Sequence, residues 1–164
     1  MREDDMMDFM PLGQDVSDIE IINEDHYSKG MTETVQPFMK SIRIKGRVSS
    51  RLPIYYELYP LENSKGTIVI SHGFTEAAAK FEELIYYFLQ AGYQCAAVDH
   101  RGHGRSFREI RNLSLVTIGS FDDYILDLHD VVHKVVMKKM DPDPETLYLY
   151  GHSMGGCIAA RYAQ

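Results

Sequence analysis

The sequence has few of the features that mark secreted or membrane-spanning proteins. Its 164 residues include two cysteines, Cys95 and Cys157, each inside an apolar segment, so structural disulfides and a cysteine-based metal site are not expected. No apolar run approaches the roughly 18 residues needed to cross a bilayer. The N-terminus is acidic, where an export signal would carry positive charge before an apolar stretch. We therefore expect a soluble, cytoplasmic protein, and peripheral membrane contact stays open.

Acidic side chains outnumber basic ones, and the excess of negative charge is concentrated at the N-terminus. The net charge is -7, and residues 1–25 hold nine acidic side chains against the single Arg2, so the remainder is nearly neutral. Such a chain repels a phosphate backbone, and nucleic acid is not expected as a partner. We interpret residues 1–37 as an acidic N-terminal extension, solvated or partly ordered. Residues 38–164 are then the folded domain.

The first regular elements have the two-residue period of strands. In KSIRIKGRV, residues 40–48, apolar and basic side chains alternate, which predicts a strand that begins near Met39. The segment PIYYELYP, residues 53–60, is bounded by prolines. The two segments are expected to pair as an antiparallel hairpin.

From residue 67 onward, predicted strands and helices alternate. The strands are 67–70, 94–98 and 146–150; the helices are 76–91, a long one from Ser120 to before Asp141-Pro142, and one that starts at Met154. Gly92 is predicted to end the 76–91 helix, because glycine commonly follows the last helical residue. This order predicts βαβ units and an α/β fold, with a mostly parallel sheet covered by helices on both faces.

The strongest motif is Gly151-His152-Ser153-Met154-Gly155, which fits G-x-S-x-G between a predicted strand and a predicted helix. In this context the pattern predicts a nucleophile elbow, a sharp turn that presents the serine hydroxyl above the sheet. Glycines two residues either side remove Cβ atoms that would collide there. Ser153 is therefore the candidate nucleophile.

An acyl-transfer site also needs donors for the developing oxyanion. The helix that begins at Met154 presents unpaired N–H groups beside Ser153. The segment His72-Gly73-Phe74 follows the 67–70 strand, where such enzymes place a second donor. We predict the backbone N–H groups of Phe74 and Met154 as oxyanion donors and a structural role for His72.

Four segments together carry a family resemblance: HGF at 72–74, DHRGHGRS at 99–106, SFDDYILDL at 120–128 and GHSMGG at 151–156. In this order they resemble the lysophospholipase and monoacylglycerol lipase group of α/β hydrolases, of the serine aminopeptidase S33 type. The resemblance covers the N-terminal half of that fold. It implies a serine esterase with a Ser-Asp-His triad that hydrolyses acyl esters of glycerol-based lipids without metal or cofactor. In that family the 99–106 loop, including Asp99, His100 and His103, is structural.

The triad acid and base of a complete esterase are both missing after the serine. Triads of this superfamily run Ser, then Asp or Glu, then His, and no such residue follows Ser153. The 164 residues are thus expected to be an incomplete and inactive portion, with the 146–150 strand as an open, aggregation-prone sheet edge. The alternatives are an α/β hydrolase for another substrate, such as a small peptide, and a non-catalytic chain that pairs with itself or a partner through that edge.

One pattern imitates a metal site. His129 and His133 lie four residues apart on the long predicted helix, with Asp130 between them. This spacing resembles H-E-x-x-H, but Asp replaces the Glu and no third ligand is evident. We expect these histidines to flank a helix, and we expect no metal.

Overall fold

A five-stranded mixed sheet organises the part of the chain that the computed structural model describes, residues 19–49 and 52–164. The strands are β1 (Ile44–Ser49), β2 (Pro53–Tyr59), β3 (Thr67–Ser71), β4 (Gln94–Val98) and β5 (Leu147–Gly151). Their spatial order is β1-β2-β4-β3-β5. The β1–β2 hairpin is antiparallel as predicted, β2 joins β4 antiparallel, and β3 lies parallel to both β4 and β5.

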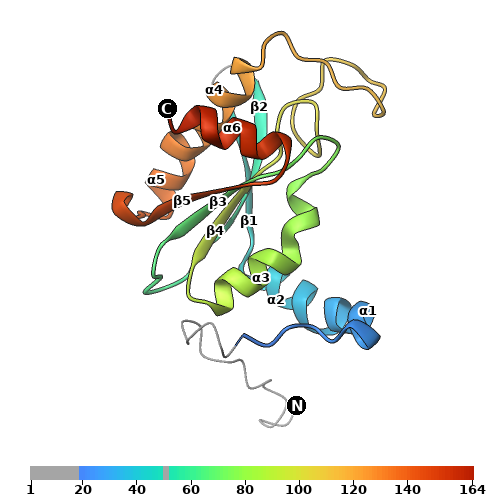
Figure 1. Cartoon of the computed structure of the whole chain (residues 1–164), viewed down its shortest axis with the longest axis vertical. Coiled ribbons are helices and arrows are strands. Elements are labelled where there is room, and N and C mark those ends of the chain that lie inside the picture. The colour runs from blue at the N-terminus through green and yellow to red at the C-terminus, as the bar shows by residue number, and fades with distance from the viewer. Residues whose placement is uncertain (1–18, 50–51) are drawn as a thin grey trace.

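Helices cover both faces of this sheet, as the alternating pattern predicts (Figure 1). The N-terminal helical elements are η3 (Glu24–His26), α1 (Tyr27–Gly30), the π-helix η4 (Met31–Val35) and α2 (Gln36–Ile42). The others are η5 (Ala78–Phe81), α3 (Glu82–Gln90), α4 (Asp122–Val131), the π-helix η6 (Val132–Val136), α5 (Met137–Lys139), η7 (Pro144–Thr146) and α6 (Met154–Tyr162). Within the described ranges, no helix combines the length and apolar character required to cross a bilayer.

Successive residues of the strands point to opposite faces of the sheet and pack into two hydrophobic cores. Val69 of β3 and Ala96 of β4 face α4, η6 and α6, where Leu128 and Ile158 are fully buried. The neighbouring strand residues point the other way, into a core with Ile85 and other residues of α3 and α2. Since the side chains of β3 and β4 are buried on both faces, their continuous apolar runs follow from the fold.

The expected strand start near Met39 is wrong, because Met39 lies in α2 and the first strand begins at Ile44. Val35, Phe38, Met39 and Ile42 recur at helical spacing, and Pro37 occupies the first turn of α2, a position that favours a helix. Met39 and Val35 are completely buried against the α3 side of the sheet. The burial of these apolar side chains stabilises a helix, although the alternation that starts at residue 40 is typical of a strand. The prediction for residues 1–18 lies outside the described residues.

The other predicted elements are confirmed, with shifted boundaries. The helix expected over 76–91 begins as η5 at Ala78, and α3 ends at Gln90. Gly92 follows with a φ of +92°, a left-handed conformation that suits glycine after a helix end. The long helix from Ser120 is a continuous run through α4, η6 and α5.

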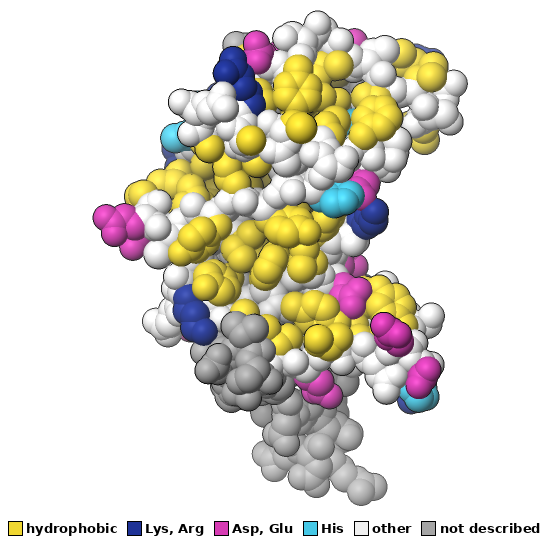
Figure 2. Space-filling model, viewed as in Figure 1, with side chains coloured by type: hydrophobic (Ala, Val, Ile, Leu, Met, Phe, Trp, Pro, Cys, Tyr) yellow, Lys and Arg dark blue, Asp and Glu magenta, His cyan; other side chains and the backbone are white. Residues whose placement is uncertain are grey.

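β5 forms one edge of the sheet and pairs, among the described strands, with β3 alone. Aromatic side chains gather beside it: Tyr150 contacts the rings of Phe81 and Phe88, and Tyr93 contacts Tyr148, which is partly exposed. Figure 2 shows hydrophobic side chains collected over the middle of the face on which β5 lies. An apolar strand edge of this kind is suited to pairing with further polypeptide.

The burial of Met39 predicts that the N-terminal helical segment is part of the cooperative fold. Met39→Ala should lower the free energy of unfolding by about 2 to 5 kcal/mol, because it removes a fully buried side chain and leaves a cavity. Urea unfolding followed by circular dichroism measures this change. Lys40→Ala, on the exposed side of α2, is the control and should change stability by less than about 0.5 kcal/mol. Equal effects of the two substitutions would show that α2 does not pack as described.

Candidate active site

Ser153 lies where the sequence predicts it, at the junction between β5 and α6. Its backbone has a φ of +52° and a ψ of −118°, a region that costs a residue with a side chain about 1 to 3 kcal/mol. The residue is exposed, and its hydroxyl has no hydrogen-bond partner among the described residues. The turn therefore holds a strained, accessible serine at the carboxyl edge of the sheet.

Two glycines permit this turn because backbone passes where a side chain would be. A Cβ atom on Gly155 would lie 2.0 Å from the carbonyl oxygen of Ser71, and one on Gly151 would lie 2.5 Å from the Cα of Gly156. The N–H of His152 donates to the same Ser71 carbonyl at 3.1 Å. The elbow is thus closed directly onto the end of β3.

The 72–74 segment runs beside the serine, as expected for an oxyanion loop. A Cβ built on Gly73 would lie 3.2 Å from the Cβ of Ser153, so this loop approaches Ser153 through a residue without a side chain. No acceptor among the described residues takes the N–H of Phe74 or that of Met154. Both predicted donors are therefore free to bind an anionic oxygen.

Glu76 is a site residue that the sequence reasoning missed. Its Oε2 accepts hydrogen bonds from the N–H of Gly73 at 2.8 Å and from Nδ1 of His152 at 2.9 Å. Its Oε1 pairs with Lys80. One carboxylate thereby joins the 72–74 segment to the residue directly before Ser153. The sequence signal that could have identified Glu76 is its position three residues after Gly73, inside a tight turn.

Glu76 stays ionised over the neutral range. Partial burial by itself raises the pKa of this carboxyl, but the hydrogen bonds from Lys80, Gly73 and His152 outweigh it and lower the pKa to about 2. Because an ionised carboxylate only accepts hydrogen bonds, Nδ1 of His152 carries the proton. His152 is therefore oriented toward Glu76, and it makes no hydrogen bond to Ser153.

Three buried histidines lie beneath this loop. His72 donates from Nδ1 to the Gly73 carbonyl at 2.7 Å and accepts at Nε2 from the N–H of His100 at 3.0 Å, which confirms its structural role. His100 reaches Ser71 Oγ at 2.8 Å, and the His72 ring contacts that of His103. Burial lowers the pKa of each of these histidines, so they are neutral side chains in the folded protein.

The loop that follows β4 is held by buried polar contacts, as the resemblance implies. Asp99 accepts hydrogen bonds from the N–H groups of Ala78 and Arg105, each at 2.7 Å. The Arg105 side chain contacts the buried carboxylate of Glu57 at 3.1 Å. Gly104 has a φ of +47°, and any Cβ there would collide with Asp99. Asp99 is thus a structural anchor within this loop.

A second anchor connects the same loop to α4. Arg101 makes a two-pronged ion pair with Asp127, with contacts of 2.7 and 2.9 Å, and also contacts Asp123 at 3.1 Å. Arg101 and Asp127 are both buried, where planar bidentate geometry gives strong and specific hydrogen bonds. The DHRGHGRS and SFDDYILDL motifs therefore meet in space.

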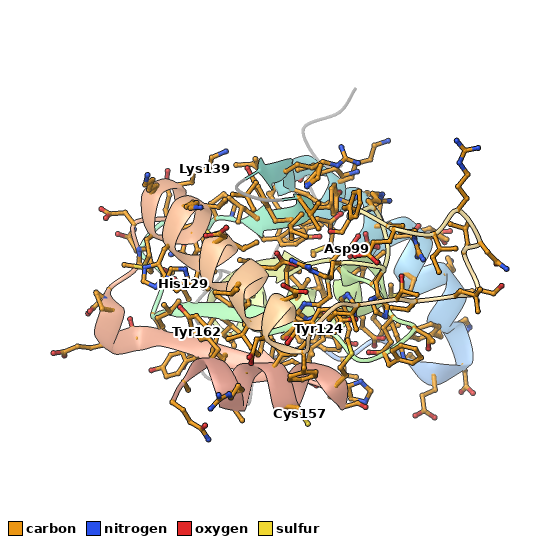
Figure 3. The ribbon with its side chains drawn as sticks, turned by 90° about the horizontal axis from the view of Figure 1, so that it is seen from above. Asp99, Tyr124, His129, Lys139, Cys157 and Tyr162 are labelled. Atoms are coloured by element: carbon orange, nitrogen blue, oxygen red, sulfur yellow. The ribbon has the colours of Figure 1, made fainter. Side chains whose placement is uncertain are left out.

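His129 and His133 lie apart from Ser153, on the flank formed by α4 and η6. Their rings lie with centroids 4.2 Å apart, and the Tyr162 hydroxyl of α6 is hydrogen-bonded to Nε2 of His133 at 3.2 Å. Figure 3 shows His129 and Tyr162 side by side at one end of the molecule. In the portion of the chain that the structure describes, no three His, Cys, Asp or Glu residues gather as a metal site requires.

Both the sequence and the fold of the chain match known proteins. The family model described as serine aminopeptidase, S33, matches residues 62–164. The chain is 30% identical over 114 residues to lysophospholipase L2 of Escherichia coli (69% of this chain, 32% of that protein) and 33% identical over 100 residues to human monoglyceride lipase (61% and 30%). It thus spans about a third of the length of these relatives. A solved carboxyl esterase from Bacillus coagulans, in complex with glycerol, aligns with a TM-score of 0.62 at 27% identity, covering 74% of this chain and 39% of its own.

The contact between Gly155 and β3 predicts unequal effects of alanine at neighbouring glycines. Gly155→Ala should lower the free energy of unfolding by about 1 to 3 kcal/mol or more, because its Cβ would overlap the fixed Ser71 carbonyl. Gly156→Ala should be neutral or stabilising by up to about 1 kcal/mol, since its Cβ meets ordinary contact distances in a helix. Thermal unfolding of both variants measures the difference. A neutral Gly155→Ala variant would contradict the described elbow.

The buried histidines predict a loss of stability in mild acid. Their pKa values are lowered in the folded protein, so below the ordinary value of about 6.5 the unfolded chain binds more protons, and stability falls as the pH falls. His100→Gln removes one such group, and its dependence between pH 6.5 and 5 should be shallower by up to about 1.4 kcal/mol per pH unit. Urea unfolding at a series of pH values measures it. His129→Gln, on an exposed flank, is the control, and parallel curves for wild type and His100→Gln would disprove the assignment.

Proposed function

Because the chain belongs to the serine aminopeptidase S33 family of α/β hydrolases, in the lysophospholipase and monoacylglycerol lipase-like group, we propose that it supplies the nucleophile of a serine hydrolase acting on acyl esters of glycerol-based lipids. The observation that carries the proposal is Ser153, exposed and held at a φ of +52° between β5 and α6. Strain of this kind is characteristic of sites where a side chain must be presented for reaction. The names of the relatives support the substrate class.

In this mechanism Ser153 Oγ attacks the acyl carbon of the ester, and a general base accepts the hydroxyl proton. The carbonyl oxygen gains negative charge in the tetrahedral intermediate. The N–H groups of Phe74 and Met154 donate to that oxygen, and the N-terminal end of α6 favours the charge. Collapse of the intermediate releases the glycerol-bearing alcohol, and water then hydrolyses the acyl-serine to free acid.

The expected positions of the triad acid and base limit the activity of the 164 residues on their own. Superfamily triads take both residues from later in the chain than the serine, and residues 154–164 contain no Asp, Glu or His. The adjacent His152 is held by Glu76. Without a base the hydroxyl stays protonated and weakly nucleophilic, so we propose that this chain alone is nearly inactive.

A peptide substrate is the second candidate, and the family description favours it, because the matching model is that of a serine aminopeptidase. The same nucleophile and oxyanion donors serve amide and ester carbonyls. Specificity then depends on what surrounds the elbow and not on the elbow itself.

Chemical rescue tests the nucleophile and the missing base together. A fluorophosphonate probe should label the chain slowly, and added imidazole, acting as an external base, should accelerate labelling of Ser153 at least about tenfold, since general bases contribute roughly 10²- to 10⁴-fold. Mass spectrometry identifies the labelled residue and its rate. Ser153→Ala should abolish labelling, and Ser28→Ala, at an exposed serine of α1, should not.

The two parts of the proposal fail separately in this experiment. Rapid labelling of Ser153 without imidazole would show that the chain holds a working base. Labelling that imidazole does not accelerate, or that survives Ser153→Ala, would show that Ser153 is not the nucleophile.

A further inference from the structure

A cavity of about 470 Å³ lies next to the oxyanion loop and plays no part in the acyl chemistry described above. The 74–77 turn forms one wall, and the segment from Gly102 to Val116 forms the other. Its lining is mixed, with Phe74, Leu113 and Val116 beside the polar Thr75 and Ser114. A site of this composition accommodates a small amphipathic group held by a few polar contacts.

Arg108 is the unusual residue in this lining. Its guanidinium nitrogens Nε and Nη1 are buried and have no hydrogen-bond partner among the described residues. Arg108 also takes part in none of the ion pairs found in that part of the chain. Arg108 as a whole is half-buried and lines the cavity, so an anion bound there would compensate its unpaired charge.

The other charged groups of the cavity are already paired with each other. Glu76 accepts from Gly73 and His152 and pairs with Lys80, so its charge is compensated within the loop. His103 is neutral, and its Nδ1 donates to the Arg101 carbonyl at 3.0 Å. The unbalanced charge in the lining is therefore the positive charge of Arg108.

Ser153 and the cavity both border the 72–74 segment. Gly73 lies against Ser153, and the ring of the next residue, Phe74, packs on that of His103 with centroids 5.5 Å apart. The oxyanion loop is thus the partition between nucleophile and cavity. In a lysophospholipid, only the glycerol backbone separates the ester carbonyl from the phosphate.

We propose that this cavity binds the phosphate of a lysophospholipid head group, and that Arg108 selects such anionic glycerolipids over neutral monoacylglycerols. The proposal rests on the proposed function for its link to catalysis, and it adds a residue that determines specificity. A guanidinium presents its donors in a fork that matches the oxygens of a phosphate. A glycerol hydroxyl offers no charge to compensate the unpaired guanidinium.

Calorimetric titration of the 164-residue chain with head-group analogues tests the site. The chain should bind sn-glycerol 3-phosphate and should show no comparable affinity for glycerol. Arg108→Gln should weaken binding of sn-glycerol 3-phosphate by roughly 10- to 100-fold, the range expected for a charged hydrogen-bond partner. Arg111→Gln, at an exposed arginine of the same segment, is the matched control and should bind as wild type. Unchanged binding by Arg108→Gln would overturn the proposal.

Two further measurements identify the ligand and guard against a misfolded variant. Inorganic phosphate should bind more weakly than sn-glycerol 3-phosphate, and equal or tighter binding would assign the site to free phosphate and overturn the head-group proposal. In the unsubstituted chain, the NMR resonance of the Arg108 Nε–H should shift on addition of sn-glycerol 3-phosphate. An unshifted resonance at saturation would overturn the proposal without any substitution.

Titration of the Ser153→Ala variant separates this proposal from the proposed function. Its affinity for sn-glycerol 3-phosphate should equal that of the unsubstituted chain. If binding depends on Arg108 but imidazole fails to accelerate labelling of Ser153, the anion site stands and the hydrolase proposal fails. If labelling is rescued but no variant alters binding, the nucleophile stands and the role of Arg108 fails.

Discussion

The direct contact between the start of α6 and the end of β3 is the constraint on which the site depends. Gly155 lies so close to the Ser71 carbonyl that no side chain fits between them, and the His152 N–H donates to the same oxygen. With both ends of the turn fixed, Ser153 has to adopt a positive φ. The strain is sustained by the packing around it, because β3 is buried on both faces and does not yield. The position of the hydroxyl is therefore a property of the sheet and not of a flexible loop.

Neutral and charged polar groups under the site carry out distinct tasks. The histidines His72 and His100 fix the oxyanion loop through short hydrogen bonds to backbone and to Ser71, and they do so uncharged, which avoids the cost of a buried cation. Glu76 remains charged at the surface of the loop, where three donors compensate it. The uncharged histidines and the compensated carboxylate together hold the 72–74 segment beside Ser153, which is the preorganisation that the proposed oxyanion donors require.

The features that the sequence predicted correctly are those set by local pattern. The elbow, the hairpin and the alternating elements follow from short-range spacing of glycines and apolar residues. The strand predicted near Met39 failed because the burial of Val35 and Met39 against α3 is a long-range contact, invisible to the alternation that follows. Glu76 and Arg108 were missed for a related reason. A carboxylate or guanidinium in a loop has no periodicity, and its role emerges only when the fold shows which partners it has and which it lacks.

The same structure separates the chemistry of the site from its selectivity. Gly155 and His152 contact the Ser71 carbonyl at the end of β3, and Gly151 pairs with Ser71, so substitution around the turn is destabilising in any hydrolase that uses it. The part of the second cavity wall that follows Ser106, from Arg108 to Val116, meets the fold through few backbone hydrogen bonds. Side chains such as that of Arg108 can change there without disturbing the elbow, since the buried anchors Asp99 and Arg101 precede them and hold the start of the loop. A turn fixed by backbone contacts beside a wall of replaceable side chains allows one fold to accept different substrates.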